Sequence, residues 1–159
     1  MRILAAVLAF VLTSAIVTRA AAQTASAPPD KQALAIAITG PRRVRSGSKA
    51  TIQIAMTNLS GRAIIFDTAP SAEYVYEAIV RDAHGNMAPD TEHGKEVRRS
   101  FEPPFPVYSG PINPLEPGKT WKNELVINDL YDLTRPGKYS VQVLCGGAKS
   151  DAITVTVIP

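Results

Sequence analysis

Residues 115–144 read LEPGKTWKNELVINDLYDLTRPGKYSVQVL, and residues 151–159 read DAITVTVIP. Two Pro-Gly pairs, at 117–118 and 136–137, each precede a run in which apolar and polar residues alternate. Such alternation predicts a strand with one buried face, and the Pro-Gly pairs predict the turns between strands. We therefore expect antiparallel strands joined by tight turns in this part of the chain. Their predicted bounds are residues 120–127, 137–145 and 152–158.

Four further runs of the same kind lie upstream. They span residues 34–38, 50–57, 62–67 and 74–82. Turn signals separate these runs: GPRRVRSGS at 40–48, NLSG at 58–61 and HGN at 84–86. No segment after residue 22 shows helical periodicity, although LYDLT at 130–134 has room for a single helical turn. The sequence predicts an all-β sandwich of two antiparallel sheets.

Residues 87–114 form the one long stretch without clear periodicity. It contains several prolines, which lack the N–H group that a sheet ladder requires. We interpret it as a long crossing loop with room for a short edge strand.

Several strand and turn residues carry a family resemblance. They are the strand end Met56-Thr57-Asn58, the D-x-x-G turn at 82–85, the Pro-Gly turn at 115–118 and the PGxYxV pattern at 136–141. In this order they resemble bacterial immunoglobulin-like domains, and the layout is also similar to the intracellular proteinase inhibitor (BsuPI-type) domain. The resemblance implies an immunoglobulin-like sandwich of about seven antiparallel strands. Tyr139 would then be either a corner tyrosine, with its hydroxyl bound to upstream backbone, or an ordinary core residue.

The N-terminus has the features of an export signal. A charged start is followed by an apolar run at residues 3–17, and Ala20 and Ala22 fit an A-x-A processing site. The run is shorter than the roughly 20 residues that a bilayer requires, which favours a cleaved signal over the alternative of a retained anchor. We predict a signal peptide at 1–22, a disordered leader at 23–32 and the sandwich at 33–159, in a periplasmic or secreted protein.

Charge and cysteine content limit the partners and sites. Of the 17 basic residues, Arg2 and Arg19 lie in the predicted signal, so 15 remain against 14 acidic residues. A nearly neutral chain exerts little long-range attraction on a polyanion, so no nucleic-acid partner is expected. Cys145 is the single cysteine, which excludes an intramolecular disulfide and a Cys-based zinc site. It shares strand parity with Tyr139, which predicts a small buried residue rather than a reactive thiol.

Residues 82–96 collect both histidines of the chain with four carboxylates. The group consists of Asp82, His84, Asp90, Glu92, His93 and Glu96. These side chains suit a hard or borderline metal, but their spacing matches no ligand motif, so we predict a polar loop without metal. No nucleophile motif such as GxSxG or SxxK is present, so no catalytic residue and no cofactor is predicted.

The strongest binding candidate is the segment FEPPFPVYSGPINP at 101–114. Its prolines stiffen the backbone, and Phe101, Phe105 and Tyr108 can present rigid apolar area to a partner. The alternative is that these rings cover the open end of the sandwich. A second candidate is a basic patch formed by Arg42, Arg43 and Arg45, although such clusters are usually solvated turns.

These observations together favour an exported, non-catalytic binding or accessory module. Its expected partner is another extracytoplasmic protein, with no integral membrane segment after processing. Two alternatives stay open at this stage. One is a proteinase inhibitor that uses residues 101–114, and the other is a metal-assisted hydrolase built on residues 82–96.

Overall fold

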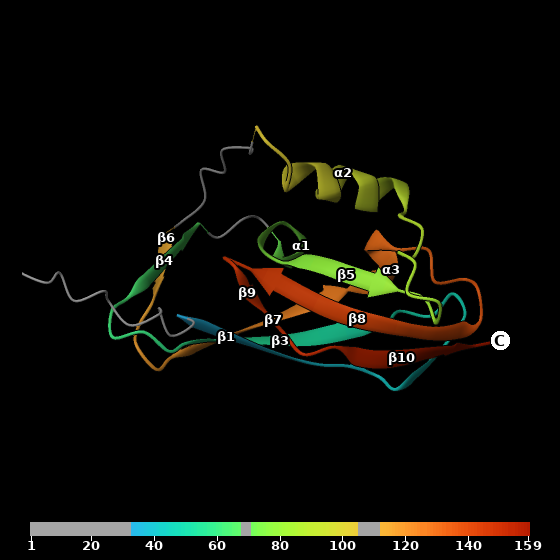
Figure 1. The fold of residues 1–159 in the computed structure, drawn as a ribbon, viewed down its shortest axis with the longest axis horizontal. Coiled ribbons are helices and arrows are strands. Elements are labelled where there is room, and N and C mark those ends of the chain that lie inside the picture. Colours follow the sequence, from blue (N-terminus) through green and yellow to red (C-terminus); the bar gives the residue numbers. More distant parts are fainter. Residues whose placement is uncertain (1–32, 68–70, 105–111) are drawn as a thin grey trace, which may run out of the picture.

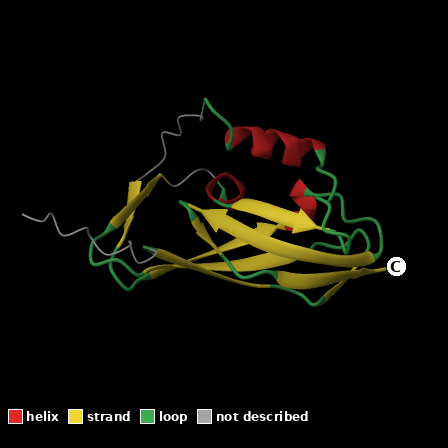
Figure 2. Cartoon of the chain, in the orientation of Figure 1, coloured by secondary structure: helices red, strands yellow, loops and turns green. Residues whose placement is uncertain are grey.

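The computed structural model describes residues 33–67, 71–104 and 112–159. Two sheets pack face to face around one apolar core (Figures 1 and 2). The first sheet has the strand order β1 (Leu34–Thr39), β3 (Thr51–Asn58) and β7 (Thr120–Val126). The second has the order β2 (Arg43–Arg45), β10 (Ile153–Ile158), β8 (Gly137–Cys145) and β5 (Glu77–Arg81), with β9 (Ala148–Lys149) paired to β8.

The two main sheets confirm the predicted immunoglobulin-like sandwich of about seven strands. Every strand pair in them is antiparallel except β2 with β10, which run parallel. Strand β8 has the predicted bounds, and β7 and β10 each differ from their prediction by one residue at one end. The turn and alternation signals of the C-terminal half were therefore sufficient to place β7, β8 and β10, whereas the two-residue strand β9 lies in a segment predicted as a turn.

The core lies between the sheets and consists of the inward-facing residues of each strand. Val141 and Val143 of β8 are fully buried and Tyr139 is 6% exposed, which confirms the predicted face of this strand. Ile52 and Ile54 of β3 come from the opposite sheet and are 0% and 1% exposed. Each such side chain contributes about 1.5–3 kcal/mol by leaving water.

Tyr139 is a corner tyrosine as well as a core residue. Its ring belongs to the core cluster, and its hydroxyl donates a hydrogen bond to the carbonyl oxygen of Arg135 at 2.9 Å. Burial raises the pKa of the Tyr139 hydroxyl. The bond holds the Pro-Gly corner against the start of β8, as in other sandwiches of this class.

The predicted turn at 58–61 is stabilised by a buried asparagine. Asn58 Oδ1 accepts a hydrogen bond from the Ser60 main-chain nitrogen at 2.8 Å. Asn58 Nδ2 donates to the carbonyl oxygens of Arg62 at 2.8 Å and Leu115 at 2.7 Å. The side chain is 0% exposed, so these bonds satisfy polar atoms that would otherwise be costly to bury. Asn58 thereby links the turn to the strand that ends at Leu115.

The long loop predicted at 87–114 contains a helix, which corrects that prediction. Helix α2 spans Glu92–Ser100, and Thr91 caps it by accepting a hydrogen bond from the Gly94 nitrogen at 2.9 Å. Only Gly94 and Val97 of the helix are buried. An apolar face of two residues is too narrow to give a helical period in the sequence. The short edge strand allowed for in this segment exists as β6 (Ile112–Leu115).

Three smaller predictions also need correction. The turn at 40–48 contains β2, and the N-terminal part of the strand predicted at 74–82 is the single helical turn α1 (Ala72–Val75). The helical turn expected at 130–134 lies earlier, as α3 (Ile127–Leu130). All three are elements of three or four residues, in which tertiary contacts outweigh local propensity.

Helix α2 is anchored to the second sheet by a charged network. Arg98 donates to both carboxylate oxygens of Asp90, at 2.9 and 2.6 Å, and to the hydroxyl of Tyr131 at 3.1 Å. The Tyr131 hydroxyl in turn donates to the carbonyl oxygen of Ala78 in β5. The hydrogen bond to Asp90 raises the pKa of Arg98, and burial raises the pKa of Tyr131. The network covers the outer edge of β5.

A two-stranded ribbon extends from one end of the sandwich (Figure 1). It pairs β4 (Ile64–Asp67) with β6 in antiparallel register. Ile65 is 68% exposed on this ribbon and lies opposite Pro114.

None of the helices formed by residues 33–67, 71–104 and 112–159 is long and apolar enough to cross a membrane.

Candidate functional site

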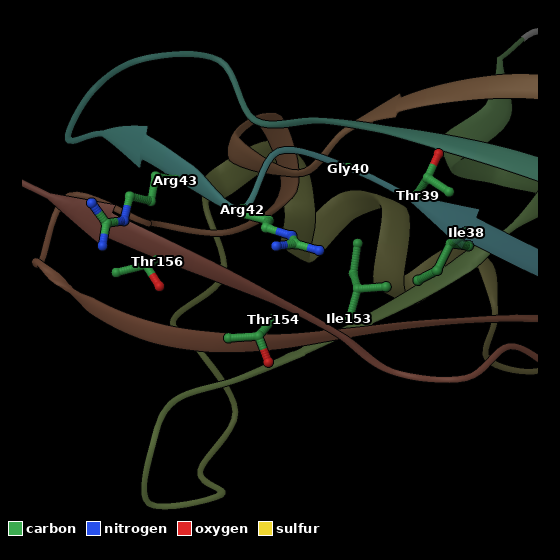
Figure 3. A pocket seen from close by; sticks show the side chains of 8 residues that line it. All are labelled: Ile38, Thr39, Gly40, Arg42, Arg43, Ile153, Thr154 and Thr156. Atoms are coloured by element: carbon green, nitrogen blue, oxygen red, sulfur yellow. The ribbon is translucent and has the colours of Figure 1, made fainter.

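A cavity lies where the chain passes from one sheet to the other. We call it the strand-switch groove, and its volume is about 570 Å³ (Figure 3). It is lined by Ile38, Thr39, Gly40, Arg42, Arg43, Ile153, Thr154 and Thr156. These residues belong to the end of β1, the crossing segment, β2 and β10. The volume is within the range of about 300–1,000 Å³ found for small-ligand sites.

Close packing at Gly40 determines where the crossing occurs. A Cβ atom at this position would lie 2.5 Å from Cδ1 of Ile52 and 3.2 Å from Cδ1 of Ile153. A larger residue at this position would force the Ile52 side chain to move, so glycine lets the backbone pass close to the core. Pro41 follows and has no N–H group to extend a sheet ladder. The chain therefore leaves β1 at Gly40 and joins β10 only at Arg43, which pairs with Thr156.

The groove carries two guanidinium groups that have no acidic partner in the described structure. The side chains of Arg42 and Arg43 are exposed, and no carboxylate lines the groove. The ion pairs among residues 33–67, 71–104 and 112–159 are His93 with Glu73 and Glu96, Lys95 with Glu92, and Arg98 with Asp90. The two arginines thus keep their full capacity to bind an anion.

The other lining groups determine what kind of anion fits. Figure 3 shows the Arg42 side chain reaching toward Ile153, which lies on the same wall as Thr154. Thr39, Thr154 and Thr156 are lining residues that carry hydroxyl groups, and Ile38 adds apolar surface. Guanidinium groups bind carboxylates with two parallel hydrogen bonds, and hydroxyls add donors and acceptors. The groove suits a carboxylate on a partly apolar ligand.

The predicted binding residues of the Pro-rich segment do not all belong to the described structure. Phe105 and Tyr108 lie in residues 105–111, outside the described part of the chain. Phe101 is the C-terminal cap of α2, is half-buried and packs against the core cluster. The role of Phe101 as a binding residue stays a prediction from the sequence.

The six residues of the 82–96 cluster make local contacts and do not converge on one point. Asp82 Oδ1 accepts hydrogen bonds from the main-chain nitrogens of His84 and Asn86. Asp90 binds Arg98, and Glu92 binds Lys95. His93 Nε2 lies 3.1 Å from Glu73 Oε1, and His93 Nδ1 lies 4.0 Å from Glu96 Oε2. Within the described residues, no three His, Cys, Asp or Glu side chains come together to hold a metal.

Cys145 ends strand β8 and is partly buried against the core. Burial raises the pKa of its thiol to about 11. At neutral pH the group is therefore almost entirely protonated, and a protonated thiol is a poor nucleophile. This agrees with the prediction of an apolar packing residue.

The sequence indicated one wall of the groove but not the other. The cluster of arginines at 42–45 and the Gly-Pro pair at 40–41 were visible as a basic turn. The opposite wall comes from Ile153, Thr154 and Thr156, more than 100 positions away, and no motif connects the two segments. The alternation of Thr and Val in this strand predicts which of its faces is buried, but it does not indicate which segment of the chain lies beside the strand's edge.

Comparison with known proteins gives similarity to solved structures alone. No family model matches the chain, and no curated protein is similar to it in sequence. The CARDB domain of a Pyrococcus furiosus protein, solved in complex with di-metal ions, has 15% identity and a TM-score of 0.42, covering 79% of this chain and 87% of that one.

Two larger enzymes contain regions that match as well. A β-glucosidase from Listeria innocua, solved with glucose, has 16% identity and a TM-score of 0.46, covering 79% of this chain. An alkylpurine DNA glycosylase from Pseudomonas fluorescens, bound to DNA, has 14% identity and a TM-score of 0.45, covering 80% of this chain. This chain spans 16% and 31% of those two proteins.

Proposed function

We propose that this protein is an exported, non-catalytic binding module that binds a carboxylate group of another extracytoplasmic protein in the strand-switch groove. One observation carries the proposal. Arg42 and Arg43 line a groove of about 570 Å³ without any carboxylate of the described structure to neutralise them. Charge-assisted hydrogen bonds to such groups contribute about 1.5–3 kcal/mol each.

The surrounding structure supports a site that is formed before binding. Gly40 is held between Ile52 and Ile153, and the Arg42 carbonyl oxygen accepts a hydrogen bond from the Thr156 nitrogen at 2.9 Å. The backbone that carries both arginines is thus joined to β10. A prearranged site loses less conformational entropy on binding than a flexible one.

Export belongs to the proposal because the expected partner is extracytoplasmic. It rests on the N-terminal apolar run and the A-x-A pattern at Ala20 and Ala22. Intact mass of the protein recovered from the extracytoplasmic fraction tests it, and the expected start is Gln23. Recovery of the chain from that fraction with Met1 still present would contradict the cleavage site.

The binding test uses one peptide, which we call the acidic probe: acetyl-Glu-Glu-Thr-Val-Ser-Val-Thr-Glu-Glu-amide with a fluorescent label. Fluorescence anisotropy at low ionic strength measures its affinity for the processed protein. We expect saturable binding that weakens with added salt, because exposed charges are screened within about 10 Å at 0.1 M salt. The same peptide with Gln in place of every Glu should bind at least about tenfold more weakly.

Variants of the protein identify the site. Arg42→Gln combined with Arg43→Gln should weaken binding of the acidic probe by about tenfold or more. Arg45→Gln combined with Lys49→Gln is the matched control, because it also removes two exposed positive charges; Arg45 lies on β2 with Arg43, and neither Arg45 nor Lys49 lines the groove. Equal losses in the two proteins would show a general basic surface instead of a built site. No saturable binding up to about 1 mM would also overturn the proposal.

The two alternative functions stay predictions from the sequence. The inhibitor prediction rests on residues 101–114, and an assay of protease inhibition by the processed protein tests it. The hydrolase prediction rests on residues 82–96, whose side chains make the local contacts described above.

A further inference from the structure

Two strand edges with unpaired main-chain groups face the strand-switch groove. Strand β10 pairs with β2 only over Thr156–Ile158, and no other strand of the described residues pairs with its preceding residues on that side. Strand β1 is the outer strand of its sheet, and it does not pair with β10. The groove is therefore bounded by the open edges of both sheets as well as by arginine side chains.

The hydrogen-bond pattern shows which residue of β10 directs its main-chain N–H and C=O groups toward the groove. The main-chain nitrogen of Thr156 donates to the Arg42 carbonyl oxygen, and the Ile158 carbonyl oxygen accepts from the Ser46 nitrogen. Main-chain groups of a strand alternate between its two neighbours. Thr154 has the same parity as Thr156, so its N–H and C=O point to the β2 side, where the pairing with β2 has not yet begun.

The same argument identifies the opposite residue in β1. The Leu59 nitrogen donates to the carbonyl oxygen of Ala33, so the odd-numbered residues of β1 bond to β3. Ile38 therefore points its N–H and C=O away from β3. Both Ile38 and Thr154 line the groove.

We infer that the ligand of the strand-switch groove is an extended polypeptide segment with an acidic residue, which adds as a short strand beside Thr154 and Ile38 while its carboxylate binds Arg42 and Arg43. Strand addition supplies affinity through main-chain hydrogen bonds, and nearby side-chain contacts supply specificity. This inference rests on the proposed function, since it specifies the ligand of the same site.

Backbone methylation of the acidic probe separates the two parts of the recognition. Two modified peptides carry N-methyl groups at alternate residues of the Thr-Val-Ser-Val-Thr tract, one on the odd and one on the even positions. Methylation removes the N–H donors and keeps all four glutamates. We expect each peptide to lose about tenfold or more in affinity, because one set of N–H groups faces Thr154 of β10 and the other set faces Ile38 of β1.

Hydrogen exchange on the protein gives an independent readout. The amides of Thr154 and Ile38 should exchange more slowly when the unmodified acidic probe is bound. The amides of Val155 and Thr39 are matched controls, since their parity already pairs them with β8 and β3. Their exchange should change little.

The outcomes distinguish this inference from the proposed function. Equal binding of the unmodified and both methylated peptides, with the loss in the Arg42→Gln, Arg43→Gln protein retained, would overturn strand addition and leave carboxylate binding intact. Unchanged exchange at Thr154 and Ile38 in the saturated complex would also overturn strand addition. If the Arg42→Gln, Arg43→Gln protein bound the acidic probe as tightly as the original protein, the proposed function itself would be overturned.

Discussion

Gly94 is the position at which the contact between α2 and α3 is most sensitive to one added methyl group. A Cβ atom there would lie 1.9 Å from the carbonyl oxygen of Leu130 and 2.7 Å from its carbonyl carbon. Both atoms belong to the backbone, so no change of side-chain rotamer can relieve the contact. Ordinary contact begins near 3.4 Å, so α2 and α3 must separate by about 1.5 Å in a close-packed region.

We therefore expect Gly94→Ala to lower the free energy of unfolding by about 2–4 kcal/mol. Severe overpacking costs about 3 kcal/mol, and alanine returns about 1 kcal/mol because it favours the helix. The separation also strains the hydrogen bonds from the Thr91 nitrogen to Leu130 and from the Thr91 hydroxyl to Asp129, each contributing about 1 kcal/mol.

Urea denaturation of the purified protein measures this change, with the slope against urea checked for two-state behaviour. Gly61→Ala is the matched control, because no atom lies within 4 Å of the position that its Cβ would occupy. We expect that variant to be unchanged or about 0.4–1 kcal/mol more stable, as its unfolded chain loses freedom. Equal stability of the Gly94→Ala protein and the original protein would refute the proposed close contact between α2 and α3.

Four other side chains of the described structure should affect stability or reactivity in measurable ways. Val141→Ala removes fully buried methyl groups and should cost about 1–3 kcal/mol in a urea titration, whereas a change below about 0.5 kcal/mol would place Val141 on the surface. Tyr131→Phe should cost about 1–3 kcal/mol, since it leaves the buried Ala78 carbonyl without its donor, and an unchanged midpoint would argue against that bond. Cys145 should react slowly with iodoacetamide near pH 8 and faster as the pH approaches the thiol pKa of about 11, so fast labelling at pH 8 would contradict its burial. Phe101→Ala should lower the melting temperature because the ring packs against the core, and an unchanged melt would instead favour a recognition role.

Local signals in the sequence determined most of the sandwich. The Pro-Gly pair before Tyr139 and the alternation that follows it predicted β8 with its observed bounds and its buried face. The NLSG turn at 58–61 was equally readable. Such signals succeed because a turn depends on the preferences of adjacent residues, and a half-buried strand shows its orientation in every second position.

The tertiary structure alone decided the parts in which the local signal is weak or absent. Helix α2 buries only Gly94 and Val97, so its stability comes from the Thr91 cap and from the Arg98 network, which no period in the sequence reveals. Strand β2 has three residues and exists because β10 offers it a partner.

The candidate site shows the same division. The sequence indicated that Arg42 and Arg43 lie in a turn, but not that Thr154 and Ile153 form the facing wall. Two segments more than 100 residues apart meet only when the sheets pack, and the free energy of that packing comes from the core residues behind the groove. The arginine cluster is therefore a property of the sequence, whereas the groove exists only in the folded protein.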